Sequence, residues 1–170
     1  MNDRLNDICQ AVKERFGVDS SEFRDQVSLL VPPESIVKMC QVLRDEFGFA
    51  RLASETAVDY WPQQDPRFHV VYQLHSFQHN DRICLRVPVP GSKPFVPTLV
   101  TVYLNANWYE REIWDMFGIR FEGHPDMRRI LMPEDWDGHP LRKDYPLGYE
   151  EVEFTFNFEK IDLRKPRPKE

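Results

Sequence analysis

Residues 68–89 read FHVVYQLHSFQHNDRICLRVPV, two runs of alternating apolar and polar residues joined by a short polar segment. Apolar side chains at every second position fall on one face of a strand. These residues are Phe68, Val70, Tyr72 and Leu74 in the first run and Ile83, Leu85, Val87 and Val89 in the second. Asn80 and Asp81 are typical turn residues, so the segment predicts an antiparallel hairpin with one buried face.

Two helices and two strands are predicted before this hairpin. Residues 3–16 carry apolar side chains three and four positions apart and are followed by Gly17, the pattern of an amphipathic helix. Residues 26–31 are rich in strand-forming residues, residues 34–47 repeat the helical spacing, and residues 49–60 form a weaker strand pattern. The expected order is therefore helix, strand, helix, strand.

A short helix is predicted after the hairpin, over residues 108–117. Asn107 is expected to cap its N-terminus, with Glu110 reaching back to the N–H of Asn107. Gly118 is expected to end the helix, because glycine adopts the positive φ of a C-terminal cap without a Cβ clash. Residues 98–104 are apolar and β-branched but follow a proline, so they fit either a strand or a helix.

This order of elements predicts an α+β fold with a mainly antiparallel sheet and helices on one side. We expect an N-terminal helix within residues 1–24, one α+β domain over residues 25–146, and an extended C-terminal arm over residues 147–170. In the arm, phenylalanine recurs at every second position from 154 to 158, and a basic, proline-containing end follows.

The composition excludes several classes of protein. The chain has 170 residues, a net charge of −6 and a pI near 5.4, which argues against nucleic acid as a partner. No apolar run approaches the roughly 20 residues that span a bilayer, and the N-terminus lacks a signal-peptide pattern. The three cysteines are widely spaced, which argues against a disulfide framework, a zinc ribbon or an iron–sulfur cluster held by this chain alone.

Residues 107–146 concentrate large and charged side chains, including three of the four tryptophans and two Gly-His-Pro triplets. The helix within them has one apolar face, with Arg111, Glu112 and Asp115 roughly opposite. Arg111 and Asp115 stand four residues apart and are expected to pair. Beyond the helix, prolines exclude further long helices, and residues 130–132 are expected to form a short strand. The charged face fits either a solvated surface or a docking surface.

Catalytic chemistry finds little support in the sequence. His124, Asp126 and His139 could converge on a metal ion, which gives the alternative of a stand-alone metal-dependent hydrolase. Against that alternative, no helical His-x-x-x-His is present, and each of these histidines, placed between glycine and proline, is expected to fix its turn through backbone bonds. The helix carboxylates are more simply ion-paired than catalytic, and no glycine-rich phosphate loop is present. The sequence predicts no catalytic, cofactor-binding or metal-binding residue.

Three nearly contiguous motifs carry a resemblance to a known family. They read EREIWDMFGI at 110–119, FEGHPDMRRIL at 121–131 and GHPLRKDYP at 138–146. Together they resemble the signature of the 30-kilodalton subunit, also called the C subunit, of respiratory complex I, the proton-pumping NADH:quinone oxidoreductase. Weaker similarity extends the match to about residues 26–160.

The resemblance implies a peripheral subunit on the cytoplasmic side of the cell inner membrane. Its chief neighbour would be the D subunit, which forms the quinone site, with the B, I and G subunits nearby. FMN and iron–sulfur clusters would lie in other subunits, and NADH and quinone would be met only through the complex. The complex is a translocating enzyme, whereas the chain alone is expected to contribute no catalytic residue. The resemblance also implies the form that is not fused to the D subunit. The nearest alternative is the equivalent subunit of a membrane-bound hydrogenase-type complex.

We therefore expect a structural role, in which residues 107–146 and the C-terminal arm dock on the D subunit. Arginine suits such surfaces because its guanidinium binds carboxylates through two parallel hydrogen bonds. The expected interface residues are Glu110, Arg111, Glu112, Asp115, His124, Asp126, Arg128, Arg129, His139, Arg142, Lys143, Asp144, Tyr145, Phe154, Phe156 and Phe158.

Overall fold

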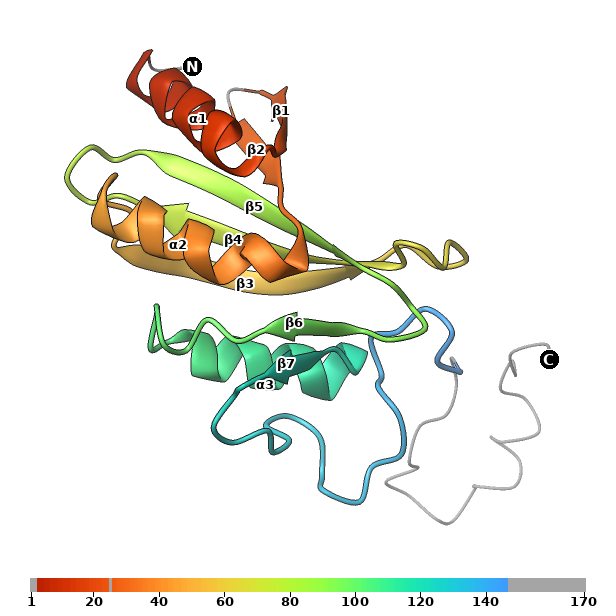
Figure 1. Ribbon diagram of the computed structural model, residues 1–170. Coiled ribbons are helices and arrows are strands. Elements are labelled where there is room, and N and C mark those ends of the chain that lie inside the picture. Colours follow the sequence, from red (N-terminus) through yellow and green to blue (C-terminus); the bar gives the residue numbers. More distant parts are fainter. Residues whose placement is uncertain (1–2, 25, 147–170) are drawn as a thin grey trace, which may run out of the picture.

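The computed structural model describes residues 3–24 and 26–146 and contains two sheets and three α-helices in this part of the chain (Figure 1). In chain order the elements are α1 (Asp3–Phe16), β1 (Asp19–Phe23), β2 (Gln26–Leu30), the 3-10 turn Pro33–Ser35, α2 (Ile36–Asp45), β3 (Arg51–Asp59), β4 (Phe68–His75), β5 (Arg82–Val89), β6 (Phe95–Pro97), α3 (Ala106–Phe117) and β7 (Arg120–Glu122).

The larger sheet has five strands in the order β1-β2-β5-β4-β3. Its neighbouring strands run antiparallel except for β2 and β5, which are parallel. The predicted hairpin is β4 and β5, paired in continuous register from Phe68 opposite Val89 to His75 opposite Arg82. The predicted α+β class with a mainly antiparallel sheet is therefore confirmed. Strands β6 and β7 form a separate parallel pair.

The core lies between the sheet and the helices. The apolar residues predicted for one face of the hairpin are all buried, and α2 covers them in Figure 1 with Ile36, Met39, Cys40 and Leu43. On the same face Glu55 of β3 and Tyr72 of β4 lie close enough to Cys40 of α2 and Glu110 of α3 to interact electrostatically. Helices α2 and α3 thus pack on one side of the sheet. The apolar face of α1 joins the same core.

Helix α3 begins earlier than predicted. Its first residue is Ala106 and Asn105 is the cap residue, so Asn107 lies within the first turn and the predicted capping by Asn107 is wrong. The Asn105 side chain instead donates to the carbonyl of Leu52 at 2.8 Å, and the Tyr109 hydroxyl donates to the carbonyl of Ala53 at 3.2 Å. These bonds tie α3 to the outer edge of β3. Gly118 ends the helix with φ +74°, as predicted.

Three short strands were not expected from the sequence. Strand β1 reads DSSEF and is mostly exposed, so it lacks the alternation that reveals a half-buried strand. Strands β6 and β7 have three residues each. Residues 98–104 form neither a strand nor a helix: Val102 and Tyr103 both donate to the carbonyl of Leu99 at 2.8 Å in consecutive turns.

The region over 3–24 and 26–146 holds no helix of the length and apolar character needed to cross a membrane. The predicted C-terminal arm, with Phe154, Phe156 and Phe158, lies outside the described residues.

Candidate functional site: the surface built on helix α3

The carboxylate of Asp115 in α3 organises the irregular segment after β7. It is fully buried, and its Oδ2 accepts three consecutive backbone N–H groups, from Ile130 at 3.0 Å, Leu131 at 2.8 Å and Met132 at 2.9 Å. Its Oδ1 accepts from Arg129 Nη1 at 2.6 Å. Burial alone would raise the pKa of Asp115, but these hydrogen bonds outweigh burial and hold it below the usual value. The strand predicted at 130–132 is wrong, because these N–H groups bind a carboxylate and not a neighbouring strand.

Arg129 and His139 fix the remainder of this segment. Arg129 Nη2 donates to the carbonyl of Trp136 at 2.8 Å, and His139 Nδ1 donates to the carbonyl of Asp115 at 2.9 Å. The His139 ring also fills the space beside Gly118, where an added Cβ would lie 2.6 Å from Cδ2 of the ring. Glycine is therefore required at 118 both for its positive φ and for the approach of His139.

The predicted pairing of Arg111 with Asp115 is wrong. Arg111 Nε donates to the carbonyl of Arg128 at 3.1 Å, Arg111 Nη2 donates to the carbonyl of Arg129 at 3.2 Å, and the guanidinium stacks over Trp108. Asp115 turns toward the interior and Arg111 toward the loop. Asp115 does not lie on the charged face predicted for this helix, because it is buried. The 100° spacing gives the direction of a side chain around the helix axis but does not say where the following chain will cover it.

Glu110 lies within the core and not at the cap of α3. Its Oε2 accepts from the Thr98 hydroxyl at 2.5 Å and its Oε1 from the Leu99 N–H at 2.6 Å, so it holds the turn that precedes α3. His124 Nε2 lies 3.9 Å from Glu110 Oε2 and 3.3 Å from the carbonyl of Asn107. Burial lowers the pKa of His124 and raises the pKa of Glu110 to about 7, against its two hydrogen bonds.

A second carboxyl group, Glu55 of β3, shares this interior. It is 5% exposed, and neither carboxyl oxygen has a hydrogen-bond partner among the described residues. Burial, with a further contribution from Glu110, raises the pKa of Glu55 well above the usual value. Burial of Glu55 therefore favours its neutral form.

We expect the free energy of unfolding to decrease as the pH rises above about 5, through 7 and beyond. The folded-state pKa values of Glu55 and Glu110 are raised, so the folded chain binds more protons than the unfolded chain in that range. Glu55→Gln keeps a neutral side chain at every pH and should flatten this decrease, whereas the exposed control Glu34→Gln should not. Urea unfolding at pH 5, 6, 7 and 8 measures the slopes. Equal slopes for wild type and Glu55→Gln would contradict the assignment.

A second ionic cluster joins the end of the described chain to the sheet. Arg67, just before β4, donates to Asp59 Oδ1 and Oδ2 at 3.0 and 2.9 Å and to Asp144 Oδ2 at 2.8 Å. Lys143 N–H donates to Asp59 Oδ2 at 2.9 Å. The guanidinium of Arg67 is packed against the rings of Trp61 and Phe68, each at 4.8 Å. Hydrogen bonds from Arg67 keep the pKa of Asp144 far below its usual value.

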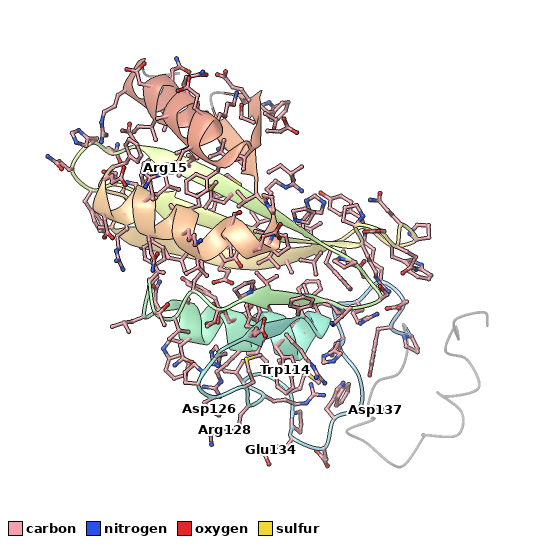
Figure 2. All side chains as sticks on the ribbon, in the orientation of Figure 1. Arg15, Trp114, Asp126, Arg128, Glu134 and Asp137 are labelled. Atoms are coloured by element: carbon pink, nitrogen blue, oxygen red, sulfur yellow. The ribbon has the colours of Figure 1, made fainter. Side chains whose placement is uncertain are left out.

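The remaining predicted residues lie nearer to solvent. Figure 2 shows Asp126 and Arg128 beside one another on the segment after β7, joined by bonds of 2.7–3.0 Å. Glu112 is exposed on α3, Arg142 donates to Asp144 Oδ1 at 3.1 Å, and the Tyr145 hydroxyl donates to the carbonyl of Asp137 at 3.2 Å.

The structure adds Asp59 and Arg67 to the residues found by sequence reasoning. The one local signal was an acidic residue at an apolar position of the β3 alternation, because Asp59 faces the core in register with Phe68. The partners of Asp59 could not be inferred, since Arg67 lies 8 residues away beyond a loop and Lys143 lies 84 residues away.

The proposed metal ligands are not assembled into a site. His124 Nδ1 accepts the backbone N–H of Asp126 at 3.0 Å, and His139 binds the Asp115 carbonyl. Within residues 3–24 and 26–146, no group of three or more histidine, cysteine, aspartate or glutamate residues is arranged to hold a metal ion. The described part of the chain thus gives no support to the hydrolase alternative.

The sequence profile of the family described as "Respiratory-chain NADH dehydrogenase, 30 Kd subunit" matches residues 29–151, which include the whole of this surface. The chain belongs to this family. A 30 Kd family relative, the C subunit of NADH-quinone oxidoreductase from Roseiflexus sp. (strain RS-1), is 54% identical over 153 residues, covering 89% of this chain and 87% of the relative.

Two solved structures share the fold of this 30 Kd family member. A trypsin-resistant fragment of Nqo5, residues 1–134, is 34% identical with a TM-score of 0.62, covering 72% of this chain and 98% of the fragment. A chain of an archaeal respiratory membrane complex, the membrane-bound sulfane sulfur reductase, is 25% identical with a TM-score of 0.71, covering 82% and 84%. The same fold thus occurs in Nqo5 and in a chain of an archaeal respiratory membrane complex.

Proposed function

We propose that this 30 Kd family member is a non-catalytic structural subunit of a proton-translocating NADH:quinone oxidoreductase. The observation that carries the proposal is the Asp115–Arg129 cluster: a buried carboxylate and a guanidinium lock α3 to the loop that runs as far as Gly138. Residues 123–146 contain no helix or strand, and hydrogen bonds with Asp115, Arg129 and Arg67 tie them to the rest of the fold. An irregular surface held in this way suits docking, because little ordering entropy is lost on binding.

In this proposal the surface of α3 and residues 119–146 docks on the D subunit at the quinone site, close to the B, I and G subunits. FMN, iron–sulfur clusters, NADH and quinone belong to those other subunits, and the chain lies peripherally on the cytoplasmic side of the cell inner membrane. The name of the Nqo5 relative supports a folded body that is stable alone, since a fragment of that protein resists trypsin. We assign the residues beyond this body, 147–170, to contacts with neighbouring subunits.

A second candidate is the equivalent subunit of another membrane-bound respiratory complex. The TM-score of 0.71 to a chain of the sulfane sulfur reductase favours it. The partners that co-purify from gently solubilised membranes separate the two: an NADH-oxidising complex with flavin supports the first, and a complex without NADH oxidation supports the second.

The test of the structural role compares a buried arginine with an exposed one. Arg129 is 13% exposed and bonded to Asp115, whereas Arg15 of α1, outside the proposed docking surface, is 53% exposed and bonded to Glu46. We expect Arg129→Ala to reduce the amount of assembled complex about tenfold, because it leaves a buried carboxylate unpaired, and Arg15→Ala to leave it unchanged. Turnover per assembled complex should be the same in both. A full yield of assembled complex with lower turnover in Arg129→Ala would refute the structural role.

A further inference from the structure

The face of the large sheet opposite α2 and α3 is not used by the surface described above. Residues paired across neighbouring strands point to the same side of a sheet. The register places Arg51, His75 and Arg82 in one row across β3, β4 and β5, and Val71 opposite Arg86 further along the sheet. We call the side chains of β2–β5 that alternate with the buried core residues the outer face.

The outer face is basic although the chain is acidic. Its basic residues on β2–β5 are Arg51, His69, His75, Arg82 and Arg86. None of the residues that these four strands contribute to this face is Asp or Glu. The carboxyls beside it are Asp19 of the edge strand β1, opposite Leu30, and Asp81, which precedes β5 and is paired with Arg4. Positive charge is thus gathered on one face of a chain whose net charge is −6.

No carboxylate ion pair among the described residues compensates the three arginines of the outer face. Arg24, Arg111 and Arg120 also lack such a pair, but they are not gathered on one face. Carboxylates within 4 Å bind Arg4, Arg15, Arg44, Arg67, Arg128, Arg129 and Arg142. Between the described residues no such pair involves Arg51, Arg82 or Arg86; Arg51 stacks on Phe77, and Arg86 donates to the hydroxyl of Tyr60. Like charges about 10 Å apart in one cross-strand row do not help an isolated domain fold. A ligand of opposite charge would relieve this repulsion.

The shape of the outer face narrows the choice of ligand. The basic row borders an open hollow of about 860 Å³, which is also lined by Ser54, Gln73 and Cys84 from the middle of the sheet. Asp81 lines it too, but its carboxylate is already paired with Arg4. At the other end of the face, Val58 and Tyr60 are each more than a third exposed. A flat lipid surface would contact only the rim of such a hollow, whereas a protruding polypeptide segment can enter it.

We propose that the outer face binds an acidic segment of a neighbouring polypeptide, whose carboxylates pair with Arg51, Arg82 and Arg86. This rests on the proposed function, in that the neighbour is another subunit of the same complex. Arginine can hold each carboxylate through two parallel hydrogen bonds, and the hollow removes those pairs from bulk water, where they are weakest.

The test places a photo-crosslinking residue, p-benzoylphenylalanine, at Gln73 of the full chain within the purified complex. We expect an adduct with a peptide of a different subunit that carries several Asp or Glu residues close to the crosslinked position. An adduct with lipid, with nucleic acid or with this chain itself overturns the proposal, and so does an intact complex that gives no adduct. If the wild-type chain does not co-purify with an NADH:quinone oxidoreductase, that result refutes the proposed function and not the binding role of the outer face.

Charge reversal gives a second, independent measurement. Arg51→Glu combined with Arg82→Glu should lower the fraction of chain bound in the complex about tenfold, while Lys38→Glu, at an exposed lysine of α2 outside both proposed surfaces, should not. Replacing the crosslinked carboxylates of the partner by lysine should restore binding of the double variant. Unchanged binding of a folded double variant, checked by its circular dichroism spectrum, overturns the proposal.

Discussion

Replacing Asp115 with alanine is expected to lower the free energy of unfolding by about 3–5 kcal/mol. The substitution leaves the Arg129 guanidinium without its carboxylate and removes the acceptor of three consecutive N–H groups, those of residues 130–132. Buried donors without an acceptor each carry a desolvation penalty of about 1–3 kcal/mol, so the segment should detach from α3 and recover those bonds with water. Urea unfolding of the chain measures the loss.

Local detachment can be separated from global unfolding by hydrogen exchange. In Asp115→Ala the amides of residues 130–132 should exchange much faster, while those of β4 and β5 keep protection close to that of wild type at low urea. Glu112→Ala, one turn earlier in α3 and exposed, is the matched control and should change stability by less than about 0.5 kcal/mol. Slow exchange at 130–132 in Asp115→Ala would show that Asp115 does not hold the segment.

The free energy of unfolding should also decrease at low pH, because Asp115 becomes protonated. The folded-state pKa of Asp115 is lowered, so its contribution is present above the pKa of the unfolded chain and is lost as the pH falls through the folded value. Glu55 and Glu110 act in the opposite sense, because their pKa values are raised and their contributions to the stability of the chain are lost as the pH rises. The stability of the chain should therefore be greatest between these two limits, in the mildly acidic range.

Local periodicity predicted the parts of the fold that depend on neighbours in sequence. The alternation in residues 68–89 gave the hairpin and its buried face correctly, because a strand's two faces are set by a period of two. The helix from Ala106 to Phe117 and its end at Gly118 also follow from local chemistry. Strand β1 escaped detection because DSSEF buries none of its side chains fully.

The candidate surface could be predicted as a segment but not as a set of contacts. The spacing of Arg111 and Asp115 fits a surface ion pair, yet the real partner of Asp115 is 14 residues away, on a loop whose path no periodic pattern encodes. The same limit applies to Glu110, which bonds to Thr98 and Leu99 across a turn. Charged residues on an amphipathic helix are normally expected to face solvent. Glu110 and Asp115 are instead buried, and their hydrogen bonds hold the segments that form the surface.

Replacing Arg67 with methionine should have the second large effect, also about 3–5 kcal/mol in the free energy of unfolding. The side chains of Arg67 and Asp59 are 3% and 1% exposed, so the substitution leaves a buried carboxylate without its counter-ion. Asp59 would retain only its hydrogen bonds from the backbone N–H groups of Trp61 and Lys143. Methionine keeps the contacts with Trp61 and Phe68, so the loss measures charge and hydrogen bonding more than packing.

The exposed partner of the same cluster gives the control. Arg142 also bonds to Asp144 but is partly solvated, and Arg142→Met should cost about 0–1 kcal/mol. Adding Asp59→Asn to Arg67→Met removes the stranded charge, so the double variant should be more stable than Arg67→Met alone, and the coupling energy from the double-mutant cycle should exceed about 1 kcal/mol. If the stability losses of Arg67→Met and Asp59→Asn were simply additive, the two side chains would not be energetically coupled. Other contacts would then have to hold Lys143 and Asp144 against the sheet.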